Sequence, residues 1–158
     1  MIITTENSHV LAWQKMEGLL PAIIQDSATG AVLMQGYMNQ EALDATLTSG
    51  KATFYSRSKE RLWMKGESSG NTLNVQQVLA DCDHDSLLIS AIANGPTCHL
   101  GTESCFPEQQ LSQQNFLSYL ERFIDERKND PAEESYTARL LARGTTKVAQ
   151  KVGEEGVE

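Results

Sequence analysis

The segment DCDHD, which begins at position 81, has three aspartates at alternate positions with a cysteine and a histidine between them. If the segment is an extended strand, its three carboxylates lie on one face and the other two side chains lie on the opposite face. The first face then holds Asp81, Asp83 and Asp85, and the second holds Cys82 and His84. Adjacent carboxylates repel one another unless a cation lies among them, and oxygen-only ligand sets suit Mg²⁺ or Ca²⁺. The motif predicts a site for a hard divalent cation, Mg²⁺ or Ca²⁺, whose reverse face offers ligands to a softer metal.

The aspartates have two other possible interpretations. A calcium-binding EF-hand loop needs glycine at its sixth position and glutamate at its twelfth. Those positions hold Ser86 and Ile92, which excludes an EF-hand. A solvated acidic turn stays an alternative, although the apolar residues on both sides of the motif favour a segment anchored in a sheet.

The three cysteines of the chain are Cys82, Cys98 and Cys105. No two of them form a Cys-x-x-Cys pair, which excludes a zinc ribbon or zinc finger, and an odd number cannot pair completely as disulfides. Three thiolates leave one zinc coordination position for water, which is typical of a catalytic zinc site. The alternative is three buried cysteines that act as small apolar residues. Cys98 and Cys105 lie in a segment rich in turn residues, which favours the metal site.

Such a zinc ion would lower the pKa of its bound water and direct hydroxide at an electron-poor carbon. Zinc deaminases attack C4 of cytosine or C6 of adenine in this way, but their His-x-Glu and Pro-Cys-x-x-Cys signature is missing here. His99 directly follows Cys98 and is the candidate catalytic acid or base.

Cations are gathered in one short part of an acidic chain. The net charge is −8, yet five cations lie within fifteen positions: Lys51, Arg57, Lys59, Arg61 and Lys65. The adjoining loop KGESSGN offers backbone N–H groups and hydroxyls to a phosphate, and Trp63 can stack on a base. An ordinary charged surface hairpin is the alternative. The predicted substrate-binding residues are Arg57, Trp63, Lys65, Glu67, Ser69, Gly70 and Asn71.

The elements that position these residues are mostly strands. Apolar runs around a polar turn at 26–30 predict a hairpin over 19–38, and a helix follows between a capping Asn39 and Gly50. Residues 52–56 and 61–65 predict two further strands, and 72–92 predict one long strand or two shorter ones. Residues 93–106 are irregular.

The second part of the chain has helical periodicity. Phe116, Leu120, Phe123 and Ile124 recur at helical spacing until the sequence NDP at 129–131. A second helix is predicted from about Ala132 to Ala142. A third is predicted from about Thr145 to the last residue, which leaves this helical segment incomplete.

Composition narrows the class of protein. The net charge disfavours nucleic acid or an anionic membrane as partner. No apolar run is long enough for a membrane span, and the first residues do not resemble a secretory signal. We expect a cytoplasmic protein with a small-molecule substrate.

The segments FYSRSKERLWMKGESSGN, DCDHD and GPTCHLGTESCF together resemble the phosphoribosyl-AMP cyclohydrolase family of histidine biosynthesis. The resemblance implies that an intertwined homodimer binds catalytic zinc through Cys82, Cys98 and Cys105 contributed by both subunits. It also implies magnesium near the substrate, bound by Asp81, Asp83 and Asp85. The implied reaction is hydrolytic opening of the adenine ring of phosphoribosyl-AMP between N1 and C6.

The segment SYTARLLARGTTKVAQKVGEEGVE resembles the start of phosphoribosyl-ATP pyrophosphatase, an all-helical family related to MazG-type enzymes. On a helix, Glu154, Glu155 and Glu158 lie at i,i+3 and i,i+4 spacing and could bind Mg²⁺ together; a solvated acidic helix face is the alternative. Because the family pattern continues beyond Glu158, we expect a bifunctional parent protein and no pyrophosphatase activity in this chain.

The predicted fold class is α+β. A β-rich cyclohydrolase domain with one clear helix spans 1–106, a linker spans 107–114, and an incomplete all-α, MazG-like segment spans 115–158. Two alternatives stay open: a non-enzymatic module in which zinc only stabilises the loop at 95–106, and a free-standing adenine or cytosine deaminase.

Overall fold

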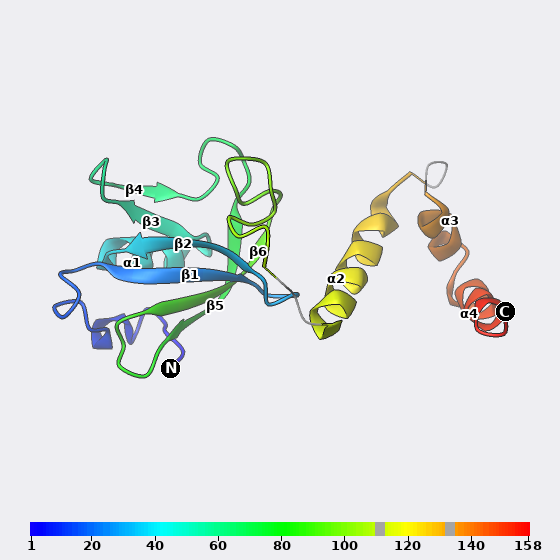
Figure 1. Cartoon of the computed structure of the whole chain (residues 1–158), viewed down its shortest axis with the longest axis horizontal. Coiled ribbons are helices and arrows are strands. Elements are labelled where there is room, and N and C mark those ends of the chain that lie inside the picture. The colour runs from blue at the N-terminus through cyan, green and yellow to red at the C-terminus, as the bar shows by residue number, and fades with distance from the viewer. Residues whose placement is uncertain (110–112, 132–134) are drawn as a thin grey trace. The chain divides into compact units, whose positions relative to one another are not determined.

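A computed structural model describes residues 1–109, 113–131 and 135–158 of the chain. The chain divides into two compact units, Met1–Leu111 and Ser112–Glu158. The first unit carries the strands and one α-helix, and the second unit is helical (Figure 1). This arrangement is an α+β fold, as predicted.

A four-stranded mixed sheet forms the body of the first unit. Its strands are β1 (Leu20–Asp26), β2 (Val32–Met38), β5 (Leu73–Ala80) and β6 (Leu87–Ala93), in the spatial order β2-β1-β6-β5. β1 pairs in antiparallel with β2 and in parallel with β6, and β5 pairs in antiparallel with β6. The predicted β1–β2 hairpin is confirmed, and the ambiguous stretch at 72–92 is two strands.

Helix α1 (Gln40–Ser49) follows β2 and covers part of the core. The Asn39 side chain accepts a hydrogen bond from the Ala42 N–H at 2.8 Å, which caps the first turn. Gly50 ends the helix in the left-handed conformation, φ 69°, which costs glycine little. Both helix limits were predicted from these residues.

A second, two-stranded sheet is formed by β3 (Thr53–Ser56) and β4 (Arg61–Met64). Phe54 of β3 is fully buried, and its ring stacks on Trp63 of β4 with centroids 5.2 Å apart. On the other side, Phe54 lies against the backbone of Gly36 in β2, where an added Cβ would come within 2.4 Å of the ring. Phe54 therefore packs the small sheet, which carries Trp63, onto the large one.

The prediction that residues 81–85 form an extended strand is wrong. β5 ends at Ala80 and β6 begins at Leu87, so the aspartates lie on the loop between them. The Asp81 carboxylate accepts hydrogen bonds from the backbone N–H groups of Asp85 and Ser86, at 3.0 and 3.2 Å, which bends the segment back on itself. We call residues 81–86 the acidic loop.

The N-terminal residues lie along the outer edge of β5. Ile3 N donates to Val78 O at 2.8 Å, and Met1 and Ala80 exchange two backbone hydrogen bonds. The short 3₁₀ helix η1 (Ser8–Val10) follows, and Ala12 N then donates to His84 O at 2.8 Å. We call residues 1–16 the N-terminal strap; it pairs with a free sheet edge and reaches the acidic loop.

The second unit contains α2 (Gln113–Glu126), η2 (Arg127–Asn129), α3 (Tyr136–Ala142) and α4 (Thr145–Glu155). α2 begins inside the segment predicted as a linker, of which 110–112 lie outside the described residues. The start predicted for the next helix, Ala132, also lies outside them, and the helix begins after Ser135, whose side chain caps Ala138 N.

The prediction that the last helix continues to the end of the chain is wrong. α4 ends at Glu155, and Gly156 donates its N–H back to Val152 and Glu154 as a C-terminal cap. Glu158 is therefore not on the helix. No helix in the described parts of the chain is long and apolar enough to cross a lipid bilayer.

Candidate functional site

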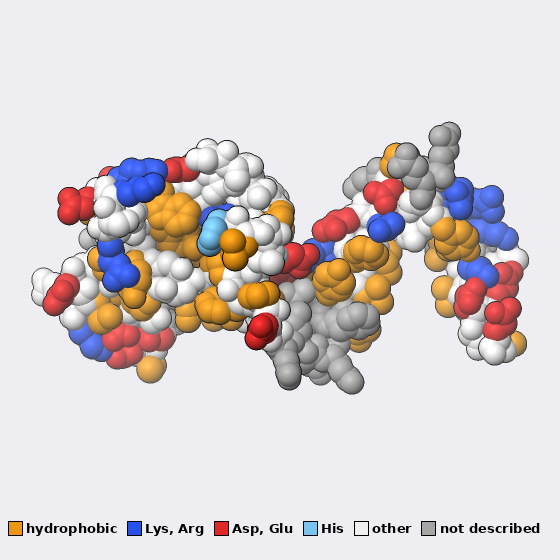
Figure 2. Space-filling model, turned by 45° about the horizontal axis from the view of Figure 1, so that its top comes forward, with side chains coloured by type: hydrophobic (Ala, Val, Ile, Leu, Met, Phe, Trp, Pro, Cys, Tyr) orange, Lys and Arg blue, Asp and Glu red, His pale blue; other side chains and the backbone are white. Residues whose placement is uncertain are grey.

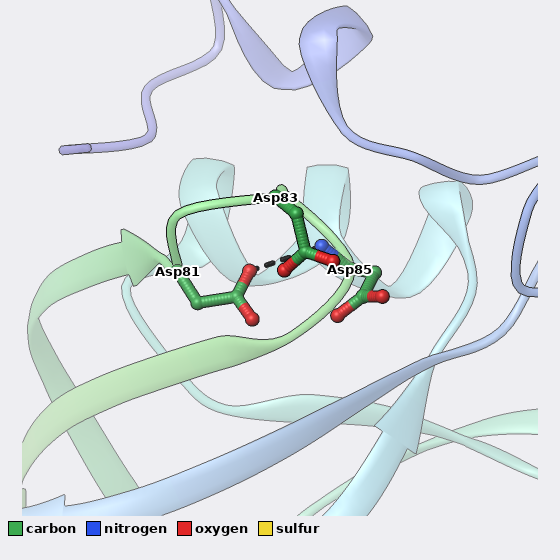
Figure 3. Close-up of side chains that lie close together, drawn as sticks. All are labelled: Asp81, Asp83 and Asp85. Atoms are coloured by element: carbon green, nitrogen blue, oxygen red, sulfur yellow. Dashed lines mark hydrogen bonds between the residues drawn. The ribbon is translucent and has the colours of Figure 1, made fainter.

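The three aspartates converge although the segment is not a strand. Ligand oxygens of Asp81, Asp83 and Asp85 all lie within 4.8 Å of one another, and the loop directs them toward the same space (Figure 3). Among the described residues, this is the one group of three acidic, histidine or cysteine side chains close enough to share a metal ion. Oxygen-only donors at this spacing fit a hard divalent cation.

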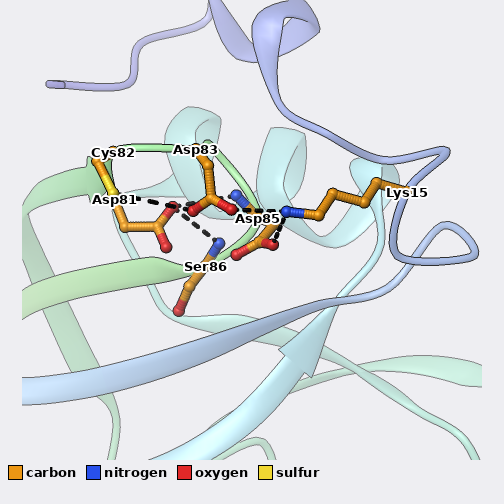
Figure 4. Close-up of polar contacts among 6 residues, drawn as sticks. All are labelled: Lys15, Asp81, Cys82, Asp83, Asp85 and Ser86. Carbon is orange, nitrogen blue, oxygen red and sulfur yellow. Dashed lines mark hydrogen bonds and ion pairs between the residues drawn. The ribbon is translucent and has the colours of Figure 1, made fainter.

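A lysine from the N-terminal strap enters this group (Figure 4). Lys15 Nζ lies 2.6 Å from Asp83 Oδ2 and 2.5 Å from Asp85 Oδ2. Hydrogen bonds to both carboxylates raise the pKa of Lys15, and the hydrogen bond from Lys15 holds the pKa of Asp83 below its usual value. The ammonium is thus a stand-in cation at the place where the sequence predicted a metal. No sequence signal connects Lys15 with residues almost seventy positions away.

A separate cavity of about 600 Å³ lies at the other end of β6. The loop after β6 supplies Cys98, His99 and Cys105 to its wall, and β4 with its following loop supplies the other side. Figure 2 shows histidine, cationic and hydrophobic side chains gathered on one face of the β-rich unit. Five predicted substrate-binding residues line this cavity: Trp63, Lys65, Glu67, Ser69 and Asn71.

Backbone hydrogen bonds form the cysteine-bearing loop. Cys98 N donates to Thr102 O at 3.0 Å, and Cys105 N donates to Leu33 O in β2 at 2.8 Å. Gly95, at φ 95°, lets the chain pass the Asn71 side chain, since an added Cβ would come within 2.8 Å of its Oδ1. These contacts hold two loops that are distant in sequence against one cavity.

The two thiols in the cavity have different affinities for protons. Hydrogen bonds from the Leu100 backbone and the Thr102 hydroxyl lower the pKa of Cys98. Partial desolvation and the neighbouring Cys98 raise the pKa of the exposed Cys105 thiol. His99 Nδ1 lies 3.9 Å from Cys98 Sγ. The Cys98 sulfur is therefore the more readily deprotonated of the two, and a thiolate is the form that binds zinc.

Two of the predicted substrate-binding residues lie outside the cavity lining, and a third is already in an ion pair. Arg57 and Gly70 are not among the residues that line the cavity. The Arg57 guanidinium lies over the Tyr37 ring, 4.1 Å from its centroid. Glu67 lines the cavity but is paired with Arg61 at 2.5 Å, and this partner lowers the pKa of Glu67.

Within one chain the structure does not bring the three cysteines together. Cys82 lies on the acidic loop before β6, whereas Cys98 and Cys105 follow β6. β6 has seven residues, and at about 3.3 Å per residue its two ends lie roughly 20 Å apart. A single chain therefore offers two thiolates at the cavity and a third at the opposite end of the strand.

The glutamates predicted as a metal site in the second unit have other contacts in the part of the chain that the structure describes. Lys151 Nζ lies 2.6 Å from Glu155 Oε1 and 3.7 Å from Glu154 Oε2, and Glu158 lies beyond the end of α4. The three glutamates do not make a group of converging ligands among the described residues.

The sequence analysis missed a cationic cavity on the same helices. A cavity of about 130 Å³ lies between α3 and α4, and its charged lining residues are all cations: Arg139, Arg143, Lys147 and Lys151. Arg139 lies on α3 and Arg143 directly follows it, whereas Lys147 and Lys151 lie on α4. The cavity therefore depends on how the two helices pack, and no single helical periodicity in the sequence predicts it.

Comparison with known proteins identifies both units. Residues 34–107 match the family model for phosphoribosyl-AMP cyclohydrolase, and residues 117–158 match the model for phosphoribosyl-ATP pyrophosphohydrolase. The chain is therefore a hydrolase that joins two hydrolase families.

Its relatives are bifunctional proteins. The histidine biosynthesis bifunctional protein HisIE of Escherichia coli strain K12 is 55% identical over 157 residues, which cover 99% of this chain and 77% of that protein. The proteins of the same name from Salmonella typhimurium strain LT2 and Yersinia pestis are both 53% identical over 99% of the chain, and 77% and 76% of those proteins are covered. The chain belongs to the family of bifunctional HisIE proteins of histidine biosynthesis.

Proposed function

We propose that the first unit catalyses the zinc- and magnesium-dependent hydrolysis of the N1–C6 bond in the adenine ring of phosphoribosyl-AMP. Water adds its oxygen to C6, the C6–N1 bond breaks, and N1 takes the proton. The exocyclic nitrogen stays on C6 as a carboxamide, so no ammonia leaves. The observation that carries the proposal is the cavity that joins Cys98, His99 and Cys105 to Trp63 and Lys65.

The residues of the cavity are proposed to have three roles: metal binding, proton transfer and substrate binding. Cys98 and Cys105 would hold zinc, which when bound lowers the pKa of water toward neutrality. His99, 3.9 Å from the Cys98 sulfur, would act as the acid or base that moves a proton to the ring nitrogen. Trp63 offers an aromatic face to a base, and Lys65, whose Nζ donates to Asn71 O at 3.3 Å, offers a positive charge to a phosphate.

The third zinc ligand is proposed to come from a second copy of the chain. Cys82 is exposed on the acidic loop, roughly 20 Å from the cavity of its own chain along β6. In a two-fold dimer, the acidic loop of one subunit can lie against the thiol cavity of the other. The symmetry then repeats this contact, so both zinc sites form in the same way. Such a dimer would also bring the acidic loop, with its magnesium, to the substrate.

Metal removal tests this function. We expect a chelator to abolish ring opening, measured by absorbance, and zinc to restore it only when magnesium is also present. Zinc and magnesium content are measured on the same sample, and ammonia is assayed in parallel. Full activity in metal-free protein contradicts the proposal. Release of ammonia with turnover would favour a deaminase instead.

For the second unit we propose that the cations between α3 and α4 bind the phosphate groups of phosphoribosyl-ATP. Lys147 is half-buried in the cavity wall, which strengthens its attraction for an anion, and its Nζ donates to the neutral Gln150 Oε1 at 2.8 Å. Lys151 also lines the cavity, but it is paired with Glu154 and Glu155.

Pyrophosphate binding tests that assignment by calorimetry. Lys147→Gln is expected to weaken binding about tenfold, the effect of losing one charge-assisted hydrogen bond. Lys128→Gln removes the same charge from a position outside the cavity, where Lys128 pairs with Asp125. Equal losses in the two variants would show that the attraction comes only from net charge.

A further inference from the structure

We propose that Lys15 is a built-in counter-cation of the acidic loop, which competes with the divalent cation for the aspartates and is displaced when that cation binds. The proposal rests on the proposed magnesium site and adds a residue that sets the affinity of that site. Lys15 lies before residue 34, where the match to the cyclohydrolase family model begins.

The first argument is the contact geometry. Lys15 Nζ lies at 2.6 and 2.5 Å from the Oδ2 atoms of Asp83 and Asp85, two of the three converging carboxylates (Figure 4). The third, Asp81, already accepts two backbone hydrogen bonds through its Oδ1 atom. The ammonium therefore occupies one oxygen of each of two carboxylates that a metal would share.

The second argument is that both cations cannot occupy this place. Mg²⁺ binds its oxygen ligands at about 2.0–2.1 Å in a strict octahedral arrangement. An ammonium hydrogen-bonded to the same oxygens would lie within a few ångströms of the metal, where like charges repel strongly. Metal binding must therefore move Lys15 away from Asp83 and Asp85.

The third argument is that the strap can keep its place while the lysine leaves. The strap is held by backbone hydrogen bonds, at Met1 and Ile3 to β5 and at Ala12 to His84. The Lys15 side chain is half exposed, and its four-carbon stem is flexible. Release then needs only a change of side-chain rotamer, and the lysine stays close enough to return.

The consequence is that Lys15 lowers the affinity of the aspartates for magnesium. Without the divalent cation, Lys15 offsets the mutual repulsion of the three aspartates and keeps the acidic loop in its folded form. With the cation, the loss of the two lysine contacts subtracts from the binding free energy. Lys15 thus raises the magnesium concentration at which the site fills.

Magnesium titration of the zinc-loaded full-length chain tests the proposal. By calorimetry, Lys15→Met is expected to bind Mg²⁺ about three- to tenfold more tightly than the unchanged protein, as expected for removal of two exposed ion pairs. Lys51→Met, a change of the same type at an exposed lysine away from the aspartates, is expected to leave the affinity within about twofold of the unchanged protein. Unchanged or weaker binding in Lys15→Met overturns the proposal, and absence of Mg²⁺ binding in all three proteins overturns the magnesium site as well.

A second measurement uses the unchanged protein and does not depend on a variant. Lysine acylation by an activated ester, followed by mass spectrometry, reports whether each ammonium is free. We expect Mg²⁺ to increase the labelling rate of Lys15 several-fold relative to Lys51 in the same sample. A Lys15 rate that does not respond to Mg²⁺, in protein that calorimetry shows to bind it, overturns the displacement.

Discussion

Co-expression of Cys82→Ser chains with Cys98→Ser chains is expected to restore ring-opening activity that neither variant has alone. Each single variant should lose more than about 100-fold in turnover, since even the loss of an outer-shell metal partner costs about 10–100-fold. In a mixed dimer with a shared zinc site, one site keeps Cys82 from one chain with Cys98 and Cys105 from the other. With random pairing, half the dimers are mixed and each has one intact site of two, so about a quarter of full activity returns.

The matched control pairs two variants from the same side of the site. Cys98→Ser and Cys105→Ser both damage the thiols that line the cavity, so no mixed dimer of these chains contains an intact site. This mixture should stay inactive, and zinc content should follow activity in both mixtures. Lack of rescue in the first mixture, with mixed dimers detected by mass spectrometry, would contradict a zinc site shared between subunits.

Replacement of Phe54 by alanine is expected to cost about 3–5 kcal/mol of unfolding free energy, the range for a fully buried phenylalanine. Phe54 has no exposed surface, lies against Gly36 and stacks on Trp63 at 5.2 Å. Its removal leaves a cavity between the two sheets and frees the Trp63 ring that borders the functional cavity. Since domains are stable by about 5–15 kcal/mol, much of the stability should be lost.

Denaturant unfolding of Phe54→Ala and Phe106→Ala measures this effect. Phe106 is 47% exposed, so the same chemical change there should alter stability by about 0.5 kcal/mol or less. A third variant, Gly36→Ala, places a methyl group against the Phe54 ring and should destabilise the same contact from the other side. If Phe54→Ala costs no more than Phe106→Ala, the contact does not join the two sheets.

The two candidate metal sites have different physical requirements. The acidic loop assembles within six residues, because Asp81 binds the backbone of the residues that follow it. The thiol cavity needs the loop that follows β4 and the loop that follows β6 to lie together. Its third zinc ligand is proposed to come from another chain. We therefore expect the aspartates to bind their cation in a monomer and the thiols to bind zinc tightly only in a dimer.

The sequence by itself determined the local elements of this protein. Two apolar runs around a polar turn predicted the strand pair at 19–38, and Asn39 and Gly50 marked the ends of α1, because capping and turn preferences depend on neighbouring residues alone. The residue types of the aspartate and cysteine motifs were sufficient for a prediction of two kinds of metal. The same local reasoning failed at 81–85, where side-chain hydrogen bonds to the backbone replaced the extended conformation.

Only the tertiary structure decided which of these elements meet. Sheet pairing placed the acidic loop and the thiol cavity at opposite ends of β6. Packing of the small sheet on the large one brought Trp63 and Lys65 beside Cys98 across more than thirty positions of sequence. The strap along β5 delivered Lys15 to aspartates almost seventy positions away. No periodicity or motif encodes these contacts, because they depend on the order of strands in the sheet and on the packing of its edges.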